Sequence, residues 1–472
     1  MPKFPSGFRF GFSTVGVQHE LGVPGSEFES DWVLWLRDPE NIAAGVVSGD
    51  DPYSGPGYWG LYKTDHEIAS WLGMDAVWIT VEWARIFPKS TREVMVKATI
   101  EGGRVESVEV DEKALRELDS LANKSALQRY REIIEDWKSR GGYVILNLFH
   151  WSLPLWLHDP ILVRRLGPDR APSGWLDTGT VVEFAKFAAY IGEKLGDLAD
   201  EWYTMNEPTV VARSGYLFVN SGFPPSYLSL EAYGKVKTRL AEAHARAYEA
   251  LKQATGKRVG IVESVSPVYV QAGDARLADQ VLGEQLYVVD AVTRGVLGGE
   301  RREDLSGRCD WIGLNYYTRV VVTSGEGGRL RFLEGYGYSC EPRGVSKEGR
   351  PCSDVGWEVY PEGLVDAGLQ VWERYRLPIY ITENGVADSE DRLRPAFVLR
   401  HLQAVHELIR RGVDVRGYFH WNLTDNLEWS KGFKPRFGLV EVDYASKKRR
   451  LRPSALVFRE VAVPKELPDL AA

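Results

Sequence analysis

Short apolar segments that recur between helical patterns limit the folds open to this 472-residue chain more than any other feature. Each segment is rich in β-branched or aromatic residues, as expected of strands buried on both faces. Helices are expected over 126–140, 180–195, 233–255 and 399–411, and glycines follow three of them, where a left-handed C-cap is favoured. Strands that alternate with helices predict a parallel (β/α)8 TIM barrel. The expected strands are 8–13, 76–81, 143–148, 201–205, 259–262, 311–314, 379–382 and 416–420.

The length alone would allow two or three domains, but barrels of this class accept long insertions within one domain. No repeat, low-complexity stretch or linker marks a boundary in the sequence. We therefore predict an α/β chain with a single domain over 1–472. Segments 50–60, 91–111 and 325–353 are interpreted as extended βα loops or insertions.

Composition narrows the possible partners. The net charge of −8 does not favour nucleic acid. No apolar run is long enough to cross a bilayer, and residues 1–11 have no apolar signal core, so we expect no membrane partner and a cytoplasmic location. The three cysteines match no metal-ligand spacing, and neither a metal nor a cofactor is expected. Their odd number argues against a disulfide framework, although Cys340 and Cys352 are candidates for a pair.

Polar side chains directly follow several predicted strands. In a (β/α)8 barrel, chemistry is located at the carboxyl ends of the strands. Packing alone explains polar groups at these positions poorly. The segments are Phe149-His150-Trp151 after the third strand, Asn206-Glu207-Pro208 after the fourth, Asn315-Tyr316-Tyr317 after the sixth, Glu383-Asn384-Gly385 after the seventh and His420-Trp421-Asn422 after the eighth.

Two of these residues, Glu207 and Glu383, are carboxylates on opposite sides of the predicted barrel mouth. Glycoside hydrolysis uses two carboxyls that flank the scissile bond, one as proton donor and one as nucleophile. The alternative is that each glutamate interacts only with the dipole of the helix that it precedes. Amide, imidazole and indole groups at the neighbouring strand ends weigh against that alternative.

Two motifs carry a family resemblance. Tyr203-Thr204-Met205-Asn206-Glu207-Pro208 and Tyr380-Ile381-Thr382-Glu383-Asn384-Gly385 resemble the acid/base and nucleophile motifs of glycoside hydrolase family 1. The likeness extends from Phe8 to Ala455 and is strongest to hyperthermophilic archaeal β-glycosidases. It implies a retaining exo-β-glycosidase that removes terminal β-linked glucose or galactose. Glu207 would be the general acid/base and Glu383 the nucleophile.

The resemblance also implies a set of sugar-binding residues, a carbohydrate as the only ligand, and assembly as a homodimer or homotetramer. For Trp151 and Trp429, ordinary packing is the alternative interpretation. The implied roles are glycone binding by Gln18, His150, Trp421, Glu428 and Trp429, a contact with the sugar 2-hydroxyl by Asn206, placement near the nucleophile for Asn315 and Tyr317, and an aglycone-side wall for Trp151.

Glu428 bears on the substrate class. In the phospho-glycosidase branch of the family a small polar residue stands there, and a lysine follows along the same loop. Here the Glu428 carboxylate would repel a 6-phosphate, and Pro435 aligns with that lysine. Unphosphorylated sugars are therefore expected.

Trp78 departs from the family pattern, which has an arginine beside the nucleophile at this position of the second strand. A neutral ring cannot replace a guanidinium charge. Trp78 is the only support for one alternative, a catalytically weakened sugar-binding barrel. A separate alternative is a transglycosidase that passes the glycosyl group to a sugar acceptor. A third possibility is that Arg85 or Arg319 supplies the missing charge.

Overall fold

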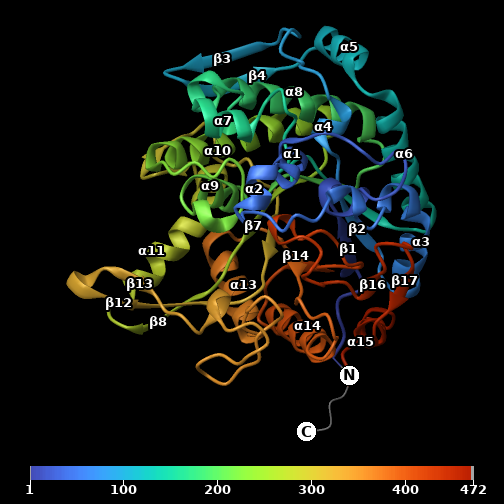
Figure 1. The fold of residues 1–472 in the computed structure, drawn as a ribbon, viewed down its shortest axis with the longest axis vertical. Coiled ribbons are helices and arrows are strands. Elements are labelled where there is room, and N and C mark those ends of the chain that lie inside the picture. Colours follow the sequence, from blue (N-terminus) through green and yellow to red (C-terminus); the bar gives the residue numbers. More distant parts are fainter. Residues whose placement is uncertain (1, 469–472) are drawn as a thin grey trace.

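A computed structural model describes residues 2–468, and in it all eight predicted strands form. They close into one parallel barrel in the order β1-β15-β14-β11-β7-β6-β5-β2, which confirms the predicted fold (Figure 1). The observed strand ends differ from the predicted ones by two residues or fewer. The barrel strands are β1 (Arg9–Thr14), β2 (Ala76–Thr80), β5 (Tyr143–Asn147), β6 (Glu201–Asn206), β7 (Val259–Ser264), β11 (Ile312–Asn315), β14 (Ile379–Asn384) and β15 (Val415–His420).

A helix follows every barrel strand along the chain, and helices surround the strands in Figure 1. The predicted C-cap glycines, Gly141, Gly256 and Gly412, have φ values of 77°, 65° and 84°. This left-handed conformation costs glycine little and ends each helix there. The outer helices are α3 (Tyr58–Trp71), α6 (Lys124–Ser139), α8 (Thr178–Leu195), α10 (Leu230–Thr255), α12 (Tyr287–Arg294), α13 (Glu362–Tyr375), α14 (Arg394–Arg410) and α15 (Pro453–Ala462).

The connections after the strands carry additional structure. Segment 91–111 contains an antiparallel hairpin, β3 (Lys97–Glu101) with β4 (Arg104–Glu109). Strands β8 (Val268–Ala272), β12 (Val320–Ser324) and β13 (Leu330–Phe332) form a small sheet that projects from the barrel (Figure 1). That the whole chain is one domain stays a prediction. The remaining elements are β9 (Val296–Leu297), β10 (Glu300–Arg301), β16 (Val440–Val442), β17 (Arg449–Leu451), α1 (Asp31–Arg37), α2 (Pro39–Ala43), α4 (Trp83–Ile86), α5 (Glu112–Leu121), α7 (Pro160–Leu166), α9 (Pro208–Tyr216) and α11 (Arg276–Gln285).

Large aromatic rings fill the inside of the barrel. Trp78, Tyr203, Trp311, Tyr380 and Phe419 lie in sequence around the interior, with neighbouring ring centroids 5.7, 6.0, 5.1 and 6.2 Å apart. All four contacts are edge-to-face, a geometry that aromatic pairs favour. Because the interior is packed, ligands are confined to the mouth at the carboxyl ends of the strands.

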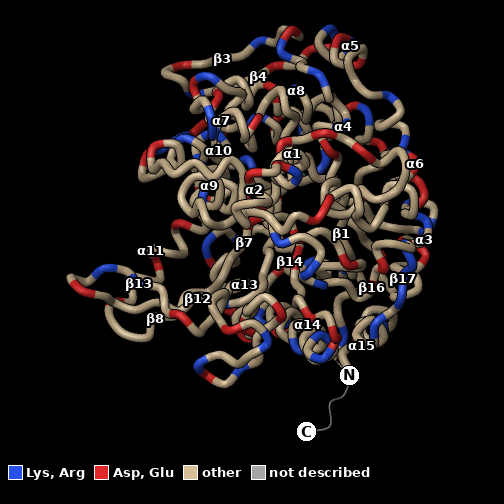
Figure 2. Tube along the Cα trace, in the orientation of Figure 1, with Lys and Arg blue, Asp and Glu red and all other residues tan. Residues whose placement is uncertain are grey.

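Charged residues of both signs are interspersed along the outer elements (Figure 2). Many form exposed ion pairs, such as Lys97 with Glu109 and Arg410 with Glu407, and screening by water makes each a weak contributor to stability. Within residues 2–468, no helix has both the length and the apolarity that a bilayer crossing requires.

Candidate active site

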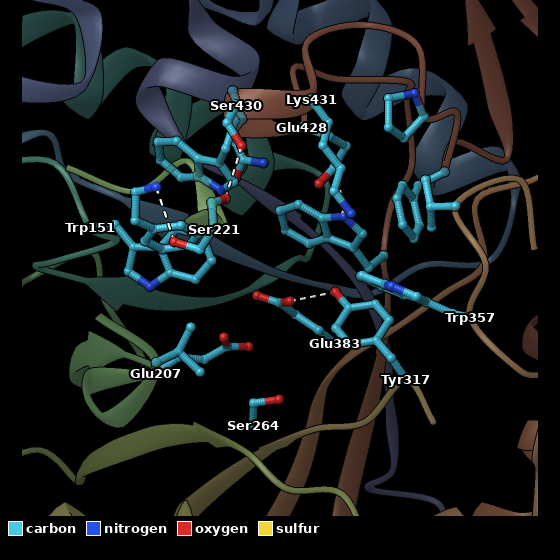
Figure 3. A pocket seen from close by; sticks show the side chains of 18 of the residues that line it. Trp151, Glu207, Ser221, Ser264, Tyr317, Trp357, Glu383, Glu428, Ser430 and Lys431 are labelled. Carbon is cyan, nitrogen blue, oxygen red and sulfur yellow. Dashed lines mark hydrogen bonds between the residues drawn. The ribbon is translucent and has the colours of Figure 1, made fainter. Parts of the chain in front are cut away.

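A pocket of about 220 Å³ opens at the carboxyl ends of the barrel strands. Nine of the eleven predicted site residues line it, and several are labelled in Figure 3. The other two, Asn206 and Asn315, hydrogen bond directly to residues of the pocket wall. The structure therefore brings the whole predicted set together. The nine lining residues are Gln18, His150, Trp151, Glu207, Tyr317, Glu383, Trp421, Glu428 and Trp429.

Glu207 lies between β6 and α9 in a left-handed conformation, with φ 48° and ψ 55°. Its backbone N–H donates to the carbonyl of Val262 at 2.8 Å. Trp151 and Trp429 are also left-handed, with φ 75° and 49°. Such backbone costs a non-glycine residue about 1–3 kcal/mol and persists only where its surroundings enforce it. The fold thus places three pocket side chains by backbone geometry that the residues themselves disfavour.

Glu383 lies at the end of β14 and is 4% exposed. The Tyr317 hydroxyl donates to its Oε2 at 2.6 Å. Its Oε1 is buried and has no hydrogen-bond partner among the described residues. Figure 3 shows the Glu383 and Glu207 carboxyl groups directed toward the same space. One oxygen of Glu383 is therefore held by the protein while the other faces the pocket.

Amide groups connect the two carboxyls to the rest of the site. Asn315 Nδ2 donates to Glu207 Oε1 at 2.7 Å and to Asn206 Oδ1 at 3.0 Å. Asn315 is itself oriented by the Thr382 hydroxyl, which donates to its Oδ1 at 2.7 Å. Asn206 Nδ2 lies 3.3 Å from His150 Nε2. This chain of hydrogen bonds fixes the rotamers of both asparagines.

The two carboxyls hold their protons more tightly than exposed glutamates. Burial raises the pKa of Glu207 to about 7, against a smaller lowering by the Asn315 hydrogen bond. Burial, and then repulsion from the Glu207 charge, raise the pKa of Glu383 well above its ordinary value. Two carboxylates that share one site seldom ionise together. Protonation of the two carboxyls is therefore coupled.

Some residues that line the pocket have buried polar atoms without a protein partner. Gln18 Oε1 and His150 Nδ1 are buried and unpaired within the described chain, while Gln18 Nε2 donates to the Leu427 carbonyl at 2.9 Å. Glu428 Oε1 accepts from Trp421 Nε1 at 3.1 Å and from Asn426 Nδ2 at 2.8 Å. Burial raises the Glu428 pKa to about 7. Because buried polar atoms normally have partners, this part of the pocket is suited to a polyhydroxylated ligand.

Trp78 is fully buried at the base of this pocket. Its ring stacks near those of His150 and Trp421, with centroids 5.6 and 6.1 Å away, and its Nε1 donates to the Thr382 carbonyl at 3.0 Å. Neither cation considered as a substitute reaches the nucleophile position, because each is paired elsewhere. Arg85 binds Glu20, and Arg319 binds Glu358 and Glu348. Neither of these two arginines therefore supplies the charge that is missing at Trp78.

Several lining residues were not predicted from the sequence. Arg213, Ser264, Trp357 and Lys431 all contact the pocket, and the Lys431 ammonium lies 5.3 Å over the Trp357 ring. Of these, Arg213 had a usable signal, because it lies on the helix that begins directly after Glu207. Trp357 lies just beyond the irregular segment 325–353, where no periodicity indicates which side chains turn inward.

Comparison with known proteins identifies the family. A model of glycosyl hydrolase family 1 matches residues 118–295 and 293–467. A β-galactosidase of Sulfolobus acidocaldarius is 49% identical, with 100% of this chain and 98% of the relative covered. The solved β-glycosidase of the hyperthermophile Thermosphaera aggregans is 50% identical, with a TM-score of 0.97 and 99% and 98% coverage. A solved β-glucosidase mutant derived from a hyperthermophilic tetrameric structure is 50% identical, with a TM-score of 0.94 and 99% and 97% coverage. The chain belongs to glycosyl hydrolase family 1 and is a β-glycosidase.

Proposed function

We propose that this protein hydrolyses terminal β-linked glucose or galactose with retention, with Glu383 as nucleophile and Glu207 as general acid/base. The Glu383 carboxylate attacks the anomeric carbon while the bond to the aglycone oxygen breaks and Glu207 gives its proton to that oxygen. Water then attacks the glycosyl ester, Glu207 takes the water proton, and the sugar leaves as Glu383 is released.

The observation that carries this proposal is a pair of buried carboxyls in one pocket, of which Glu383 has one oxygen bound by the protein and one unpaired. Glu383 Oε1 has no protein partner, whereas Oε2 accepts from Tyr317. The Tyr317 hydroxyl favours the ionised form of Glu383, since a hydrogen bond to a carboxylate stabilises its charge. The first step of retention requires an ionised Glu383 and a protonated Glu207.

The glycone side supports an unphosphorylated sugar. Gln18 Oε1 and His150 Nδ1 offer two unpaired buried groups to sugar hydroxyls, and Glu428 and Pro435 both line the pocket. When ionised, Glu428 would repel a 6-phosphate, and no group at Pro435 would bind one. The matched relatives are named β-galactosidase, β-glycosidase and β-glucosidase. They lend no support to the transglycosidase or to the weakened sugar-binding barrel.

Chemical rescue tests the two assigned roles. Glu383→Gly should lose nearly all activity on aryl β-glucosides and β-galactosides, and azide or formate should restore part of it by occupying the vacated space. Glu428→Gly is the matched control, because it also removes a carboxylate that lines the pocket, a half-buried one, but leaves the nucleophile in place. Azide should not rescue it. Rescue of Glu428→Gly, or normal turnover by Glu383→Gly, would exclude Glu383 as nucleophile.

Two further properties belong to the proposal. A homodimer or homotetramer is supported by the relative derived from a hyperthermophilic tetramer, and light scattering on a size-exclusion column tests it. A cytoplasmic location is supported by Cys309, Cys340 and Cys352, which all remain free thiols.

A further inference from the structure

A second cavity of about 630 Å³ adjoins the active-site pocket. The two share three lining residues, Arg213, Ser264 and Tyr338. The walls of the second cavity come from the end of α9, from α11, and from strands β12 and β13 of the sheet that projects from the barrel (Figure 1). It is larger than the catalytic pocket.

The second cavity lies on the leaving-group side of the site. Figure 3 shows Ser264 beside Glu207, whereas Glu428 lies beyond Glu383 on the far side. Under the proposed mechanism, Glu207 protonates the oxygen of the departing group. The aglycone must therefore extend past Glu207 and Ser264, toward the residues that the two cavities share.

The wall of the second cavity is predominantly aliphatic and aromatic. Phe218 and Phe332 are 48% and 55% exposed, a large apolar surface for residues of this size. An apolar ligand would remove this surface from water, which stabilises the complex in proportion to the area buried. The apolar lining residues are Leu217, Phe218, Val281, Val320, Val321, Leu330, Phe332 and Leu333, with Tyr233, Tyr336 and Tyr338 at the margins.

Most polar groups of the wall are already paired within the protein. Gln285 exchanges two hydrogen bonds with the backbone of Ser266. Glu284 accepts from Tyr233 and Lys237, and Arg319 is bound to carboxylates. A sugar in this cavity would find few free partners for its hydroxyls, and burying them unpaired would cost free energy. The wall therefore favours a hydrocarbon over a second saccharide.

Arg213 stands at the junction of the two cavities. Its guanidinium lies 5.9 Å over the Phe218 ring and has no ion-pair partner within residues 2–468. Its donors are free to bind oxygen atoms near the glycosidic linkage, while its methylene stem extends the apolar wall. The junction is thus polar and the remote part of the cavity apolar.

We propose that the second cavity binds the hydrocarbon chain of β-glycosides of linear aliphatic alcohols. The inference rests on the proposed glycosidase function and names the class of aglycone that this site accepts. The chain would pass Arg213 and lie between α11 and the β12–β13 strands.

A series of alkyl β-glucosides from methyl to decyl, each below its critical micelle concentration, tests the inference. Beyond ethyl, kcat/KM should rise about two- to fourfold with each methylene that becomes buried, until the chain fills the cavity. Phe332→Asp should reduce the ratio of octyl to methyl activity by about tenfold, because it places a charge against the chain. Activity on methyl β-glucoside should remain unchanged, which also reports that the variant is folded.

Ile100→Asp is the matched control, since Ile100 is 49% exposed on the distant β3–β4 hairpin. It should keep the full dependence on chain length. A flat alkyl series, a Phe332→Asp variant that retains the wild-type slope, or a gain with cello-oligosaccharide length instead would each overturn the inference. If the proposed glycosidase function itself were wrong, the protein would also leave methyl and phenyl β-glucosides unhydrolysed. The two failures can therefore be told apart.

Discussion

Trp78→Arg tests how the missing cation affects the nucleophile. The Trp78 indole Nε1 is 3.0 Å from the carbonyl of Thr382, the residue before Glu383. A guanidinium in the indole's place would therefore approach the Glu383 carboxyl. An arginine beside a carboxylate typically lowers the pKa by about 1–3 units, or about 1.4–4 kcal/mol in favour of the charged form. The Glu383 pKa is raised in the wild type by burial and by Glu207, so the variant should reverse part of that shift.

The sign of the pH effect follows from the role of Glu383. The nucleophile acts only when ionised, so activity is lost as the pH falls through its pKa. A raised pKa places this loss at a higher pH, and Trp78→Arg should move the acidic limb of kcat/KM down by about 1–3 pH units. The limb reports the coupled Glu207–Glu383 pair in the free enzyme.

A second variant separates charge from packing. Trp78→Phe also removes the hydrogen bond to Thr382, at a cost of about 0.5–1.5 kcal/mol, but it adds no charge and should leave the acidic limb in place. Thermal melting of both variants checks that the barrel is folded. An unmoved limb in a folded Trp78→Arg protein, or an equal shift in Trp78→Phe, would refute the electrostatic reasoning.

Two further predictions address the catalytic pair. Glu207→Ala should slow hydrolysis of substrates with poor leaving groups by about 100-fold or more and affect dinitrophenyl glycosides much less, because good leaving groups need little protonation; an equal loss across a leaving-group series would contradict its role as general acid. In a crystal structure of the unmutated enzyme the two carboxyl groups should lie about 5–5.5 Å apart. A separation of about 9 Å would leave room for a water molecule and would indicate inversion instead.

The barrel was predictable because its strands are buried on both faces. Segments such as Val144–Leu146 and Ile379–Ile381 are apolar throughout and alternate with amphipathic helices. A continuous apolar run of this length, bounded by turn residues, has few other stable placements. The ends of the strands were harder to predict, because the strands continue into the polar residues that follow the apolar runs. Asn206 and Asn384, for example, are still within β6 and β14.

The site was predictable where its residues directly follow the strands, and less so where insertions supply them. Glu207 and Glu383 are fixed in space by the barrel itself. Phe332 and Tyr338 belong to an irregular segment, and their position depends on how β13 pairs with β12. Local sequence does not encode such pairing, since its register is set by contacts between distant residues. The second cavity therefore became visible only in three dimensions.

Trp78 has a packing role in the structure that its lack of charge does not reveal. The sequence shows only that the arginine charge of the family is absent at this position. In the structure it completes the aromatic interior, in edge-to-face contact with Tyr203 and parallel to His150 and Trp421. An arginine here would need a carboxylate to offset its desolvation, and Glu383 directly follows Thr382, whose carbonyl accepts from the indole. The indole instead fills the same space without charge, so the barrel core is stabilised by packing while the nucleophile keeps a higher pKa. Stability and nucleophile ionisation are thus coupled at one position, and the two Trp78 variants separate them.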